Sequence, residues 1–71
     1  MTSNTSSSVL VSKDIFDGLM AVRASGKTNM FDAAAVARIA KKFGFPDAAA
    51  FVKTNRTDYS RGIFYGFGVA E

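Results

Sequence analysis

A short corner at Gly44-Phe45-Pro46 constrains the fold of this sequence more than any other feature. Gly44 can take the left-handed backbone conformation that ends a helix, and Phe45 can fold back onto the last turn. Pro46 can open the next helix, because its ring presets a helical backbone angle and the first turn needs no N–H from it. These three residues therefore predict two consecutive helices joined by a tight corner.

The residues before the corner have the clearest helical periodicity in the chain. A helix that ends near Phe43 would place four apolar residues on one face at i, i+3, i+4, i+7 spacing: Val36, Ile39, Ala40 and Phe43. Asn29 or Asp32 can cap its first turn, and the sequence leaves open which of them does so. After the corner, a shorter helix is expected over residues 46–54.

Two further helices are expected, one on each side of this pair. Ser12 is a good N-cap for a first helix over residues 13–24, which the Ser25-Gly26 pair would end. Its core face would carry Ile15, Phe16, Leu19, Met20 and Val22. A fourth helix can begin near Thr57, with apolar residues at spacings that permit one buried face: Tyr59, Ile63 and Phe64. Three glycines weaken it, so the residues after Gly66 are expected either as a helical turn or as an extended tail.

The chain length allows one small domain. With 71 residues, of which 48% are hydrophobic and seven are Phe, the chain can bury one thin core. The expected fold class is all-α, a small three- to four-helix bundle over residues 12–71. Residues 1–11 are expected to form a flexible, mainly polar N-terminal segment, because the Ser, Thr and Asn residues at its start have nothing to bury.

The composition argues against several classes of function. The sequence has no Cys and no His, and its only Glu is the terminal residue, so it lacks the usual nucleophiles, general bases and zinc ligands. We therefore expect no enzyme, no cofactor and no metal site. No apolar run reaches the roughly 20 residues of a membrane span, so we expect no membrane association. The absence of Cys suits a reducing cytoplasm.

A distinctive series of motifs runs through the centre of the chain. It consists of a G-x-TNMFD connector at residues 26–32, the Ala35-Val36 and Ala40 positions of a helix core, the Gly44-Phe45 corner and an aromatic stretch at residues 59–64. This series resembles a small family of uncharacterised proteins found mainly in phages and prophages. The resemblance covers about residues 15–66. It implies a phage-type protein in the cytoplasm of a bacterial host, and it implies no particular activity.

The leading functional hypothesis is binding to a host or phage protein, with modulation of a host defence or replication machine as the outcome. The chain has seven Phe and two Tyr, more rings than it can bury, and we expect Phe31, Tyr59, Tyr65 and Phe67 to protrude. The predicted contact residues are Asn29, Met30, Phe31, Tyr59, Arg61, Tyr65 and Phe67. The same apolar surface would also serve a homodimer.

A structural role for the connector is the alternative to partner contact. In that interpretation Asn29 and Asp32 cap the second helix, while Met30 and Phe31 close the end of the core as a hydrophobic staple. The sequence does not decide between the two roles.

Nucleic-acid binding is the alternative function. Nine basic residues stand against six acidic ones, giving a net charge of +3, and the excess lies in the second half of the chain. Ala40 and Gly44 have the spacing of a helix-turn-helix motif, although the next helix offers few polar side chains to read bases. The basic face, within residues 38–61, would hold phosphates through Arg38, Lys41, Lys42, Lys53 and Arg56. Alternatively, these cations only solvate the outer faces of the helices.

Overall fold

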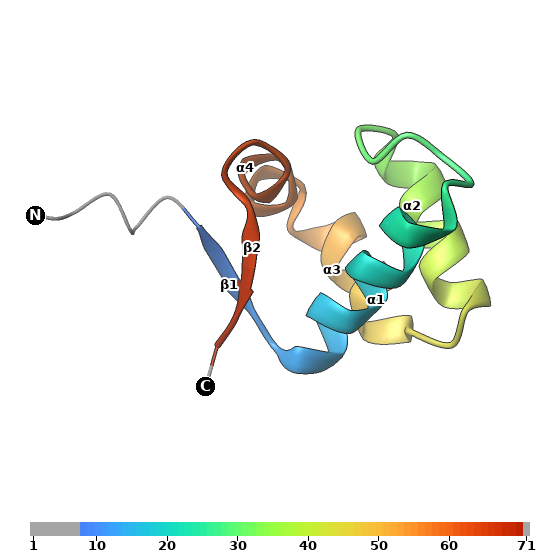
Figure 1. Cartoon of the computed structure of the whole chain (residues 1–71), viewed down its shortest axis with the longest axis horizontal. Coiled ribbons are helices and arrows are strands. Elements are labelled where there is room, and N and C mark those ends of the chain that lie inside the picture. The colour runs from blue at the N-terminus through green and yellow to red at the C-terminus, as the bar shows by residue number, and fades with distance from the viewer. Residues whose placement is uncertain (1–7, 71) are drawn as a thin grey trace, which may run out of the picture.

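The computed structural model describes residues 8–70 of the chain. Four helices and two short strands follow one another in the order β1 (Val9–Val11), α1 (Lys13–Ser25), α2 (Ala33–Lys42), α3 (Pro46–Thr54), α4 (Arg56–Tyr65) and β2 (Phe67–Val69) (Figure 1). The prediction of a mostly helical domain is confirmed, and the small sheet is an addition to it. Within the described residues, no helix combines the length and the apolar character that crossing a bilayer requires.

Short polar side chains set the starts of α1 and α2. The hydroxyl of Ser12 accepts a hydrogen bond from the backbone N–H of Ile15 over 3.3 Å, and the carboxylate of Asp32 accepts one from Ala35 over 3.2 Å. Each bond satisfies an amide that the first turn of a helix leaves without a backbone partner. Asp32, and not Asn29, is therefore the cap of α2.

The Gly44-Phe45-Pro46 corner forms as predicted. Gly44 lies in the left-handed region with φ 91°, and its N–H donates to the carbonyl of Lys41 over 3.1 Å. The N–H of Phe45 donates to the carbonyl of Ala40 over 2.9 Å, so the last carbonyls of α2 are satisfied as in a Schellman motif. Pro46 is the first residue of α3. The corner could be predicted because it depends only on the backbone angles and hydrogen bonds of residues close together in the sequence.

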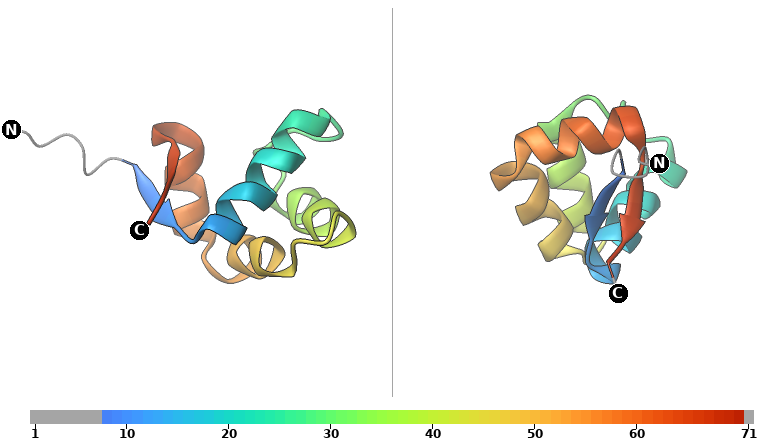
Figure 2. Two further views of the ribbon diagram at one scale, coloured as in Figure 1. Left: turned by 60° about the horizontal axis from the view of Figure 1, so that its bottom comes forward. Right: turned by 90° about the vertical axis from the view of Figure 1, so that its left-hand side faces the viewer.

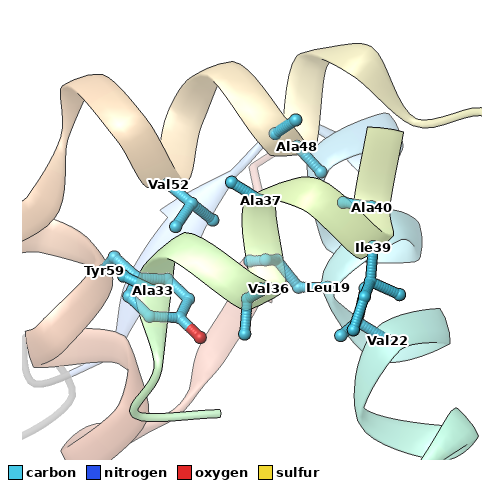
Figure 3. Packing of buried hydrophobic residues seen from close by; sticks show 11 residues of the cluster. Leu19, Val22, Ala33, Val36, Ala37, Ile39, Ala40, Ala48, Val52 and Tyr59 are labelled. Atoms are coloured by element: carbon cyan, nitrogen blue, oxygen red, sulfur yellow. The ribbon is translucent and has the colours of Figure 1, made fainter. Parts of the chain in front are cut away.

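Small side chains fill the core where α1, α2 and α3 meet (Figure 3). The largest side chains without exposed surface are Leu19, Val22, Val36 and Val52, and buried alanines surround them: Ala33, Ala37, Ala40, Ala48 and Ala49. A Cβ placed at Gly18 would lie 2.6 Å from the Cβ of Ala48 and 2.8 Å from that of Phe45. Helix α1 therefore approaches the α2–α3 corner as closely as glycine permits.

The first and last described elements pair as a parallel two-stranded sheet. Val9 lies opposite Phe67, and Val11 lies opposite Val69. Val9 and Val11 are buried, while Leu10, on the other face of the strand, is 65% exposed. The expectation of one flexible segment over residues 1–11 is therefore wrong for residues 9–11, because the two valine side chains find a buried position. Of the rest of that segment, Ser8 is exposed and residues 1–7 lie outside the described residues, and the chain after Gly66 is extended.

The strands and α4 gather at one end of the molecule, and α1, α2 and their connector extend toward the other, with α3 between them (Figure 2). The alanine-rich core lies mainly on the side of α1 and α2. Aromatic rings lie around α4, and the candidate site is found there.

Candidate protein-binding surface

The connector between α1 and α2 is a structured turn. The side-chain oxygen of Asn29 accepts a hydrogen bond from the backbone N–H of Phe31 over 2.8 Å, and the carbonyl of Asn29 accepts one from Asp32 over 2.9 Å. Asparagine favours such turns because its side chain imitates a backbone acceptor. Asn29 therefore orders the turn, Asp32 caps α2, and the positions of Met30 and Phe31 are fixed between them.

Tyr59 of α4 holds this turn from the other side. Its hydroxyl donates a hydrogen bond to the backbone carbonyl of Met30, and its ring is part of the core, with 2% of its surface exposed. Burial raises the pKa of Tyr59 to about 12, because an ionised phenol would lose its hydration there. The prediction that Tyr59 protrudes is wrong. Tyr59 is a positioning residue that ties α4 to the connector.

Two exposed rings form an aromatic patch, defined here as Phe31 and Phe64. The ring centroids lie 5.8 Å apart with an interplanar angle of 63°, which is the edge-to-face arrangement that aromatic pairs prefer. Phe31 is 64% exposed and Phe64 is 74% exposed. Phe31 was a predicted contact residue and Phe64 was not, because the spacing of Phe64 from Tyr59 also permitted a buried position. The structure brings them together from segments distant in the sequence.

The remaining predicted contact residues differ in their exposure. Phe67 is partly buried rather than protruding, with its ring centroid 5.9 Å from that of Tyr59. A Cβ at Gly62 would overlap the ring of Phe67, so the missing side chain of Gly62 is what admits this ring onto α4. Tyr65 is 60% exposed. Arg61 is exposed and its guanidinium lies 3.7 Å from the carboxylate of Asp58.

A groove adjoins the aromatic patch and opens between α1 and α4. Its volume is about 370 Å³, and it is lined by Phe16, Met20, Arg23, Met30, Gly62, Ile63, Gly66 and Phe67. Met30 precedes Phe31 in the chain and Ile63 precedes Phe64, so each ring of the patch is the chain neighbour of a groove residue. No sequence signal identified this groove, because Phe16 and Met20 were assigned to the core face of the first helix.

The five basic residues are all exposed, but they occupy two places. Arg38, Lys41 and Lys42 share one face of α2, because three- and four-residue spacings repeat the helical turn. Lys53 lies in the last turn of α3 and Arg56 begins α4, so both are at the far end of α3, which at 1.5 Å per residue spans about 12 Å. The outer surface of α3 between them exposes Pro46, Asp47 and Ala50, which offer little to phosphates or base edges.

Within residues 8–70, no three carboxylate, imidazole or thiolate side chains lie close enough together to share a metal ion. The groove lining is apolar apart from the guanidinium of Arg23. The chemistry that this surface offers is therefore apolar contact, aromatic stacking and one cationic group.

Comparison with known proteins places most of the helical region in one family. Residues 11–66 match a domain of unknown function (DUF5049), and the match extends from the end of β1 through all four helices. The chain belongs to this family. No curated protein and no solved structure matches it. The resemblance to an uncharacterised family is confirmed at this level.

Proposed function

We propose that this protein is a small, non-enzymatic accessory protein of phage type that acts by binding a host or phage protein. The observation that carries the proposal is the aromatic patch: two large rings, Phe31 and Phe64, lie exposed and in contact with each other. Aromatic side chains are enriched at protein interfaces because they bury a large apolar area when a partner covers them.

The patch is also held in place before any partner arrives. Asn29 fixes the turn that carries Phe31, and the bond from Tyr59 to the Met30 carbonyl ties that turn to α4, which carries Phe64. A surface that is already ordered loses less conformational entropy on binding, so more of its contact energy remains as affinity.

The biological setting in this proposal rests on the sequence. The motif series from the G-x-TNMFD connector to the aromatic stretch of α4 suggests a phage or prophage protein that modulates a host defence or replication machine in the bacterial cytoplasm. The absence of His and Cys from the sequence supports a role without catalysis.

Affinity capture with three matched baits tests the use of the patch. The wild-type protein, the Phe31→Ser/Phe64→Ser variant and a Leu10→Ser control are immobilised and exposed to lysate of a bacterium that harbours the gene. Leu10 is exposed to a similar degree on the small sheet, so its substitution removes an apolar side chain outside the patch. We expect a protein retained by the wild type and by Leu10→Ser and lost with the double variant.

Two outcomes would count against the proposal. Retention of the same proteins by the double variant would show that the rings do not contact the partner. Light scattering that gives the mass of two chains for the wild type and of one for the double variant would assign the patch to a homodimer instead.

A further inference from the structure

Helix α1 carries two apolar stripes, one centred on the core and one that borders the groove. Ile15, Leu19 and Val22 follow a four- and three-residue spacing and pack in or against the core. Phe16, Met20 and Arg23 follow the same spacing one residue later, which rotates them by about 100° around the helix. This second stripe lines the groove. Met20 also packs against the core, so the second stripe is shared between the core and the groove.

The opposite wall of the groove comes from the connector and from the end of the chain. Met30, Ile63 and Phe67 line it, and Gly62 and Gly66 contribute no side chains, although the ring of Phe67 lies against Gly62. The volume of about 370 Å³ is at the lower end of the range for ligand pockets, which suits one inserted side chain.

Arg23 provides the one charge in the lining. Among the described residues, the ion pairs are Lys13 with Asp17 at 2.8 Å and Arg61 with Asp58 at 3.7 Å, so no carboxylate in this part of the chain pairs with Arg23. Its place in the last turn of α1 suits the helix dipole. The helix dipole favours a cation near this end of α1, and Lys27, just beyond the helix end, is such a cation that does not line the groove. The dipole therefore does not by itself explain why a cation lies in the groove lining.

We propose that the groove receives a short peptide segment of the partner protein, in which an apolar side chain lies beside a carboxylate. The apolar side chain enters between Phe16, Met20 and Ile63, and the carboxylate pairs with the guanidinium of Arg23. The inference rests on the proposed function, because Met30 and Ile63 of the groove are chain neighbours of Phe31 and Phe64, so that one bound peptide can reach both sites. A peptide is favoured over a free small carboxylic acid as the ligand, because a small acid would fill the groove and leave the patch exposed.

Paired synthetic peptides test this chemistry. One set of short, end-capped peptides carries a central Leu or Phe with a Glu one to four residues away, and a matched set carries Gln in place of Glu. Binding is followed by the methyl NMR signals of Met20 and Met30, which line the groove. We expect Glu peptides to shift both signals and to bind about fivefold more tightly than their Gln partners, the upper range for an exposed ion pair.

Two charge variants serve as test and control. Arg23→Gln should abolish the preference for Glu over Gln, whereas Lys27→Gln, with the same change of net charge, should keep it. The inference is overturned if no peptide shifts the methionine signals, if both sets bind equally, or if Lys27→Gln acts like Arg23→Gln. Any of these results leaves the capture experiment on Phe31 and Phe64 standing, so failure of the groove and failure of the patch are distinguishable.

Discussion

Where α1, α2 and α3 meet, the side chains are small and buried, whereas around α4 they are large and two rings are exposed. The first region allows close backbone contact through Gly18. The second leaves a groove open between α1 and α4. Alanine and valine leave few gaps and lose little rotamer freedom on burial, so they supply stability, while exposed rings beside an open groove supply surface for recognition. The following predictions test this division.

The largest difference should appear between Leu19 and Ile63. Leu19 has no exposed surface, so Leu19→Ala should lower the free energy of unfolding by about 3 kcal/mol, through lost transfer energy and a new cavity. Ile63 is partly buried and borders a groove that already exists, so Ile63→Ala should cost only about 1 kcal/mol. Urea denaturation measures both. Equal losses would mean that the two regions do not differ in packing.

Gly18→Ala should lower the free energy of unfolding by about 2 kcal/mol, because the added methyl group meets the Cβ atoms of Ala48 and Phe45. Helix propensity alone predicts the opposite sign, a gain of about 1 kcal/mol. Ala24→Gly, on the exposed side of the same helix, is the control and should show the propensity effect alone. Denaturant unfolding that finds Gly18→Ala stabilising would contradict the close approach of α1 to the corner.

Tyr59→Phe should cost about 1 kcal/mol at neutral pH, since the Met30 carbonyl loses its donor. The effect depends on pH. Folded Tyr59 keeps its proton up to a pKa of about 12, against the ordinary 10.0, so between these values the unfolded chain binds fewer protons and stability falls as pH rises. The variant should lack this part of the alkaline loss. Thermal unfolding from neutral pH to about pH 11 measures it; identical pH profiles for both proteins would exclude a buried phenol.

The smallest effect is expected on the exposed face of α2. Replacing Arg38, Lys41 and Lys42 by Gln should change the free energy of unfolding by less than about 0.5 kcal/mol, because surface substitutions of this kind break no buried contact. Any binding of the wild type to random-sequence duplex DNA should disappear at physiological salt. Micromolar binding that survives such salt and depends on these three residues would instead favour the nucleic-acid alternative.

Local signals in the sequence predicted most of the helices. Ser12, Gly26, Gly44 and Pro46 act through hydrogen bonds and backbone angles within a few residues, so their effect can be read without the tertiary structure. Helix α3 has the predicted bounds, and α1 is one residue longer than expected. The choice between Asn29 and Asp32 needed the structure, because both side chains accept backbone amides, one within the turn and one at the helix start.

The candidate site was less predictable because its parts meet across the chain. The three apolar residues 9–11 follow a polar stretch and give only a weak signal for a strand. They form β1 because β2, from the other end of the chain, pairs with them. The ring of Phe67 occupies the space that Gly62 leaves. Around it Tyr59 is buried and Phe64 is exposed, whereas Tyr59 and Phe67 were expected to protrude. A groove is an absence of side chains between two helices, and helical periodicity on either one does not reveal it.

The parallel pairing of β1 and β2 also determines how the domain responds to mechanical force. The chain enters β1 at Val9, beside Phe67, and leaves β2 at Val69, beside Val11, so the two exits lie at opposite ends of the sheet. Tension applied through them slides one strand along the other and loads the inter-strand hydrogen bonds together, including those from Val9 to the Gly66 carbonyl and from Ala70 to the Val11 carbonyl. An antiparallel pair pulled from adjacent ends would instead open one bond at a time. Under tension applied through these two exits, three residue pairs would therefore bear the load before the helices do.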